Sequence, residues 1–90
     1  MRRQYLVEGM VQGVGFRFFT LREASRLGIT GWVRNAASGH VEVLAVGGAE
    51  QLAAFEASLR QGPRSAKVTN LRVLDILDEV IEYNSFEVIN

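Results

Sequence analysis

The stretch that decides the fold runs from Gly31 to Gly47 and reads G-W-V-R-N-A-A-S-G-H-V-E-V-L-A-V-G. Its β-branched and aromatic residues predict a strand over 29–35, and the apolar alternation in its second half predicts a strand over 40–46. The run A-A-S-G at 36–39 is typical of a tight turn, in which Gly39 suits a positive φ. The stretch therefore predicts a β-hairpin.

Helices are expected on both sides of this hairpin. Before it, apolar residues at 18, 21, 24 and 27 predict a helix over 18–27 that Gly28 terminates. After it, apolar residues at 52, 55 and 59 predict a helix over 49–61 that Gly62 and Pro63 terminate. Further strands are expected over 5–11, 68–74 and 85–90, and the acidic stretch 75–84 is expected to be a loop.

The order of these elements is βαββαβ with a short C-terminal strand added. This pattern predicts an α+β fold of the ferredoxin-like kind, in which an antiparallel sheet carries two helices on one face. The chain has 90 residues and no linker-like segment, so one domain over 1–90 is expected. Because this fold hosts many functions, the activity has to be inferred from a site.

Composition excludes several classes of site. The chain has no Cys and one His, so disulfides, thiolate metal sites and cysteine nucleophiles are excluded, as are multi-histidine metal sites. No apolar run approaches the ~20 residues of a membrane span, and the first residues lack a signal peptide's apolar core. A soluble cytoplasmic protein with no membrane partner is expected.

The formal net charge is zero, but the charges are unevenly distributed. Residues 1–40 contain six Arg and two Glu, for a net charge of +4, and residues 41–90 must then carry −4. Two interpretations stay open: the charges form ordinary solvated faces, or the N-terminal half attracts a small anion.

The densest chemical signal is the loop V-Q-G-V-G-F-R, from Val11 to Arg17. Its two glycines allow successive backbone amides to point into one concavity ahead of a helix, where an anion could bind. Arg17 could add a forked contact to two phosphate oxygens. The alternative is an ordinary glycine-rich turn with a surface arginine. The loop has neither the third glycine of a dinucleotide-binding motif nor the Lys of a P-loop.

A second signal is Asn35, at the end of the first hairpin strand. It is either a turn residue or a neutral group that holds a water or a substrate oxygen. Contact between Asn35 and Arg17 is possible in this topology but is not required by the sequence. Arg34 is expected on the opposite face of its strand, Trp32 on a sheet face or in the core, and His40 on a polar face.

The two motifs resemble the signatures of the acylphosphatase family, which appear here as V-E-G-M-V-Q-G-V-G-F-R at 7–17 and as the 31–47 stretch. Leu27-Gly28 and Q-G-P-R-S-A-K-V at 61–68 are also similar to the family, so the resemblance covers nearly the whole chain. Ser38 departs from it, because many members have Asp before the turn glycine, which leaves the detailed geometry of the hairpin open.

The resemblance implies a hydrolase that cleaves small-molecule acyl phosphates to carboxylate and inorganic phosphate, with no metal and no other cofactor. It implies that Arg17 binds the phosphate together with loop amides, and that Asn35 orients the attacking water. The implied phosphate-binding residues are Gln12, Gly13, Val14, Gly15, Phe16 and Arg17. A monomer without a nucleic-acid partner is expected.

The residues leave two other functions open. The segment G-V-G-F-R-F-F at 13–19 faintly resembles the aromatic strand of a single-stranded RNA-binding module, although the zero net charge and single lysine argue against it. The same anion pocket could also serve a sensor, or a carbamoyl-phosphate-handling domain of a larger protein, without turnover. The free-standing length of 90 residues speaks against the latter.

Overall fold

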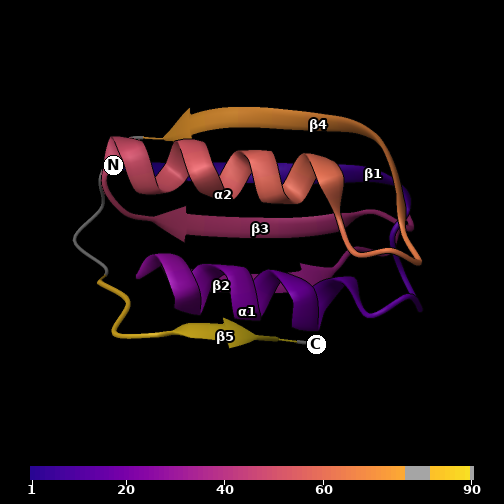
Figure 1. Ribbon diagram of the computed structural model, residues 1–90, viewed down its shortest axis with the longest axis horizontal. Coiled ribbons are helices and arrows are strands. Elements are labelled where there is room, and N and C mark those ends of the chain that lie inside the picture. Colours follow the sequence, from indigo (N-terminus) through magenta and orange to yellow (C-terminus); the bar gives the residue numbers. More distant parts are fainter. Residues whose placement is uncertain (77–81, 90) are drawn as a thin grey trace.

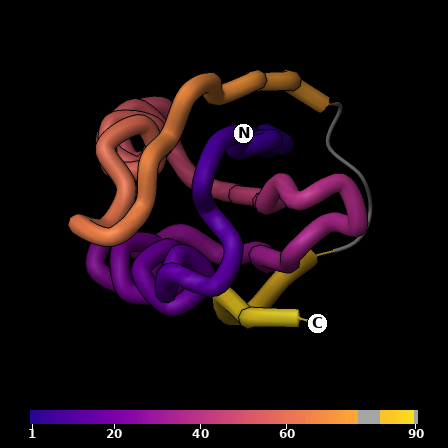
Figure 2. Tube along the Cα trace, turned by 90° about the vertical axis from the view of Figure 1, so that its right-hand side faces the viewer, coloured from indigo at the N-terminus to yellow at the C-terminus, as the bar shows by residue number. Residues whose placement is uncertain are grey.

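The computed structural model describes residues 1–76 and 82–89. In chain order its elements are β1 (Arg2–Met10), α1 (Phe16–Leu27), β2 (Thr30–Asn35), β3 (Val41–Val46), α2 (Ala49–Gln61), β4 (Lys67–Ile76) and β5 (Phe86–Val88). The strands form one sheet in the order β4-β1-β3-β2-β5, and both helices lie side by side on the same face (Figure 1). Figure 2 shows the two layers edge-on. The predicted ferredoxin-like α+β fold is therefore confirmed.

The sheet combines antiparallel strand pairs with one parallel pair. β1 pairs antiparallel with β3 and β4, and β2 pairs antiparallel with β3. β5 instead pairs parallel with β2, so the sheet is not wholly antiparallel. The reason is geometric: β4 finishes at the same end of the sheet at which β2 begins, although the two strands lie near opposite edges, and a strand that starts from that end runs in the same direction as β2.

The core lies between the sheet and the two helices. Alternate strand residues point toward the helices and are buried, as Tyr5, Val7, Val33 and Val43 are in the three central strands. The predicted hairpin forms, because the Ala36 N–H donates to the His40 carbonyl and the Gly39 N–H donates to the Ala36 carbonyl. Ser38 is thus compatible with a closed turn.

The start of α1 differs from the prediction. The helix begins at Phe16, two residues before the predicted start, and its buried residues are Phe16, Thr20 and Ala24. Phe18, predicted to lie on the core face, is 65% exposed. The apolar spacing was misleading because Gly15 adopts a left-handed conformation that starts the helix early and places the Phe16 ring against Gly62.

The remaining bounds are close to the predictions. α2 forms over the predicted residues 49–61. β4 extends through Asp75 and Ile76, which were predicted to lie in the acidic loop, because both pair with the start of β1. Residues 77–81 of that predicted loop, and Asn90 of the predicted last strand, lie outside the described residues.

Candidate active site

The loop between β1 and α1 leaves the start of the helix without a side-chain cap. Gly13 and Gly15 both have left-handed backbones, with φ of 74° and 78°. Gly15 is the N-cap of α1, no side chain bonds to the cap, and the first turn contains no acidic residue. By contrast, the Gly48 N–H at the start of α2 donates to Gln51 Oε1 at 2.7 Å. Since the first amides of a helix lack intrahelical acceptors, the start of α1 is suited to an anion.

Arg17 lies on the first turn of α1 rather than in the loop where it was predicted. It is half-buried. Within residues 1–76 and 82–89, no carboxylate forms an ion pair with it. Its guanidinium therefore adds a positive charge, uncompensated by any described neighbour, to the positive end of the helix dipole.

Asn35 is the last residue of β2 and lies on the same face as buried Val33, the face toward the helices. Its Oδ1 is buried and makes no hydrogen bond with any residue that the structure describes. Arg34 lies on the opposite face, as predicted, where its guanidinium donates to the Glu42 carboxylate. Its Cζ lies 5.1 Å from the centroid of the Trp32 ring. A buried acceptor without a partner is unusual, which makes Asn35 a candidate for binding a ligand or a water.

These groups line one cavity of about 120 Å³. The cavity is lined by Val11, Gly13, Gly15, Phe16, Arg17, Phe18 and Asn35. The sequence left contact between Arg17 and Asn35 open, and the structure brings both residues to the same cavity. It does so because α1 lies over β2, so that the first turn of the helix is placed above the end of that strand (Figure 1).

Gln12 has a role that was not predicted from the sequence. Its Nε2 donates to the carbonyl of Ala36 at 2.8 Å and to that of His40 at 2.9 Å. The side chain therefore ties the glycine-rich loop to the hairpin that carries Asn35. Nothing in the sequence signals this contact, because it joins residues 24 and 28 positions apart.

The other candidates do not line the cavity, and these include Gln12 and Val14 of the predicted phosphate-binding set. His40 contacts the Ser38 hydroxyl at 3.1 Å through Nδ1 and does not line the cavity. Over the described ranges, no three His, Cys, Asp or Glu residues are grouped so that they could hold a metal ion. No helix of that part of the chain is long and apolar enough to cross a membrane. The segment at 13–19 forms a loop and a helix, so the aromatic strand considered for RNA binding is not present there.

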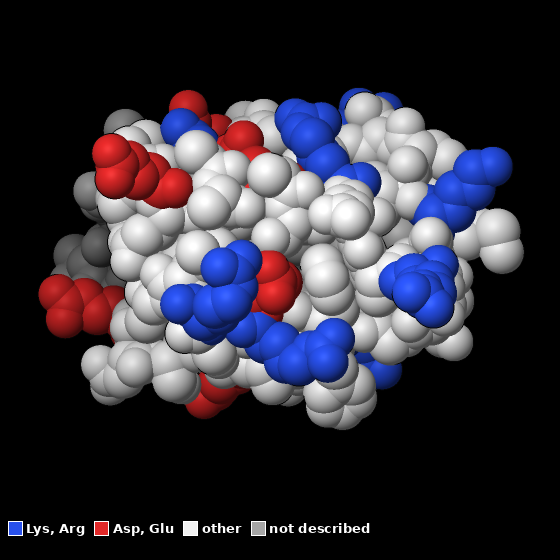
Figure 3. Space-filling model, viewed as in Figure 1, with Lys and Arg blue, Asp and Glu red and all other residues white. Residues whose placement is uncertain are grey.

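The surface charge is also uneven. Figure 3 shows basic side chains over α1 and toward the end of the molecule where that helix begins, while acidic side chains gather toward the opposite end. The distribution is compatible with the anion-attracting interpretation of the N-terminal half.

Comparison with known proteins identifies the family of this chain. The family model described as acylphosphatase matches residues 3–88. The acylphosphatase of Actinobacillus succinogenes is 59% identical over 71 residues, covering 79% of this chain and 79% of that protein. The acylphosphatase of Pasteurella multocida is 44% identical over 88 residues, covering 98% and 97%. The crystal structure of acylphosphatase from Bacillus subtilis superposes with a TM-score of 0.94 at 34% identity, covering 99% and 98%. The chain therefore belongs to the acylphosphatase family of hydrolases.

Proposed function

We propose that this protein hydrolyses the carboxyl–phosphate bond of acyl phosphates and releases a carboxylate and inorganic phosphate. The observation that carries the proposal is one cavity lined both by Arg17 at the uncapped start of α1 and by Asn35, whose Oδ1 has no partner among the described residues. A phosphoryl group matches the guanidinium and the helix start, and a water molecule matches the amide oxygen.

In this mechanism the phosphoryl oxygens are held by the backbone amides of Gln12–Phe16 and by the forked guanidinium of Arg17. Phosphoryl transfer requires mainly positioning and stabilisation of charge on the equatorial oxygens. Fixed donors in a half-buried site supply that stabilisation without reorganising. The proposed reaction therefore proceeds without a metal ion, because Arg17 takes the place of the cation.

Asn35 orients the nucleophile in this proposal. Its Oδ1 accepts a hydrogen bond from a water, and the water oxygen attacks phosphorus as the bond from phosphorus to the acyl oxygen breaks. The electron pair of that bond leaves with the carboxylate, which needs no protonation, so a general acid is unnecessary. The proton of the water passes to a phosphoryl oxygen. Gln12 supports this geometry, since its bonds to Ala36 and His40 fix the hairpin relative to the loop.

The proposed substrate is a small molecule, and the proposed unit is a monomeric domain over 1–90 that acts in the cytoplasm with neither nucleic acid nor membrane as a partner. The cavity is formed by residues of one chain, so the proposed chemistry needs no group from a second copy. The zero net charge argues against a nucleic-acid partner.

The test is hydrolysis of benzoyl phosphate by sub-stoichiometric purified protein in the presence of excess chelator. Multiple turnovers are expected, with the product inorganic phosphate acting as a competitive inhibitor. Loss of activity with the chelator would overturn the metal-free mechanism. Stoichiometric binding without turnover would instead support the anion sensor, and salt-sensitive RNA binding without hydrolysis would support the RNA-binding module.

A further inference from the structure

The rim of the cavity has one large side chain that the proposed phosphate chemistry does not use. Val11 and Phe16 line the cavity but are buried in the core, at 1% exposure each. The exposed lining residues are Gly13, Gly15 and Phe18. Because the glycines have no side chain, Phe18 supplies the only exposed side chain on this described rim.

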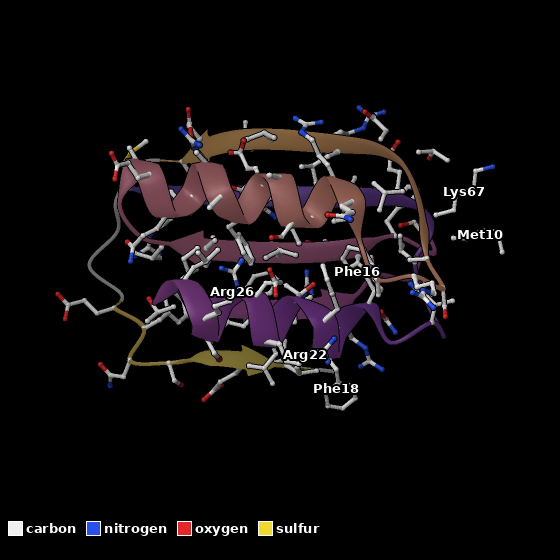
Figure 4. All side chains as sticks on the ribbon, viewed as in Figure 1. Met10, Phe16, Phe18, Arg22, Arg26 and Lys67 are labelled. Carbon is white, nitrogen blue, oxygen red and sulfur yellow. The ribbon has the colours of Figure 1, made fainter. Side chains whose placement is uncertain are left out.

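Phe18 is not used by the core. It is 65% exposed, whereas the core face of α1 is formed by Phe16, Thr20 and Ala24. Figure 4 shows Phe16 directed between the two helices and Phe18 directed away from α2, on the outer side of α1. A single exposed apolar side chain is ordinary on a protein surface. This one is distinguished by its position next to Arg17 at the mouth of the cavity.

The space over the glycines is open. A Cβ placed at Gly13 or Gly15 would meet no heavy atom within 4 Å. The proposed mechanism places the phosphoryl group against the loop and Arg17 in this small cavity, so the acyl group would extend from it toward the open rim. From there, Phe18 is the apolar surface available to it.

We infer that Phe18 is a specificity-determining residue that contacts the acyl group of the substrate and favours aromatic or bulky apolar acyl groups over acetyl. This inference rests on the proposed function and names the substrate class within it. The contact would be an edge-to-face or offset stack of the Phe18 ring on an aromatic acyl group, both common geometries for aromatic pairs.

The test compares kcat/KM for benzoyl phosphate and acetyl phosphate in the wild type, Phe18→Leu and Phe18→Ala. The ratio of benzoyl to acetyl kcat/KM is expected to fall about 3- to 10-fold in Phe18→Ala, as loss of one partly exposed aromatic contact implies. Phe18→Leu should give an intermediate ratio. Met10→Ala is the matched control, since Met10 is similarly exposed at 67% but does not line the cavity, and its ratio should equal that of the wild type.

An unchanged ratio in Phe18→Ala would overturn the inference. So would an equal fall for both substrates, because Phe18 would then support the helix start and not the acyl group. Failure of the wild type to hydrolyse either substrate would be a different result, since it would overturn the proposed function itself.

Discussion

Arg3, near the start of β1, and Arg17, on the first turn of α1, are half-buried guanidinium groups at opposite ends of the sheet. Arg3 bonds to Glu56 at 2.7 Å and to Asp75 at 2.6 Å, and the Tyr5 hydroxyl donates to the same Glu56 oxygen at 3.0 Å. Arg17 has no comparable partner among the described residues and shares its cavity with the unpartnered Oδ1 of Asn35.

The contrast between the paired Arg3 and Arg17, which has no ion pair with a described residue, suggests that the first stabilises the fold and that the second serves the proposed function. Polar groups that are paired within the protein stabilise the folded state, and a buried polar group without a partner destabilises it. Groups kept unpaired near a cavity remain available to a ligand. We therefore expect substitutions at the Arg17 end to change activity and substitutions at the Arg3 end to change stability.

The largest effect is expected for Arg17→Ala. It should lower kcat/KM for acyl phosphates by about 10³-fold or more, since it removes the guanidinium charge that would stabilise the transferring phosphoryl group. It should change the free energy of unfolding by less than about 0.5 kcal/mol, because no ion pair with a described residue is lost. Steady-state kinetics and urea denaturation measure the two quantities. Arg22→Ala, five residues further along α1 at an exposed position, is the control and should retain activity.

Asn35→Ala is expected to lower kcat by about 10²- to 10³-fold, as loss of one preorganised group at a reacting centre does. The inhibition constant for inorganic phosphate should change little, because Asn35 acts on the water. Removal of a buried unpartnered oxygen should not destabilise the protein. If phosphate affinity were lost together with kcat, the separate roles of Asn35 and Arg17 would be wrong.

Glu56→Gln tests the end of the sheet at which Arg3 is paired. It should lower the free energy of unfolding by about 1–3 kcal/mol, because the charge that accepts from Arg3 and Tyr5 is removed from a half-buried network. The activity of the folded fraction should remain that of the wild type. Glu87→Gln is the control, since Glu87 is exposed and should change stability by less than about 0.5 kcal/mol. A selective loss of kcat in Glu56→Gln would break the division between the two ends.

Alkaline pH should have a smaller effect on the free energy of unfolding, through Tyr5 beside Glu56. Burial, and then the Glu56 carboxylate, raise the pKa of Tyr5 above its usual range. The unfolded chain releases the phenol proton near pH ~10 while the folded protein retains it, so the free energy of unfolding falls as the pH rises above that value. The slope from this group is at most about 1.4 kcal/mol per pH unit. Tyr5→Phe should flatten the decline of the free energy of unfolding measured by urea denaturation at increasing pH.

Sequence patterns predicted the elements where local signals agree. The hairpin and α2 were predicted well, because alternation, turn residues and helix termination all indicate the same bounds. The start of α1 was not, since the apolar residue Phe18 belongs to the rim of a cavity and not to the core. Arg17, Asn35 and the glycines were predicted as candidates. Their common cavity and the bridge made by Gln12 depend on tertiary packing, which no local pattern contains.

The position of β3 between β1 and β2 also determines when activity can appear during folding. Val41 of β3 pairs with Val7 of β1 on one side and with Asn35 of β2 on the other. The glycine-rich loop that follows β1 and Asn35 at the end of β2 therefore meet only after both strand pairings are in register. Long-range pairings of this kind raise the contact order and slow folding. Recovery of hydrolysis during refolding would thus report the fully native sheet, and a collapsed intermediate with helices already formed would be inactive.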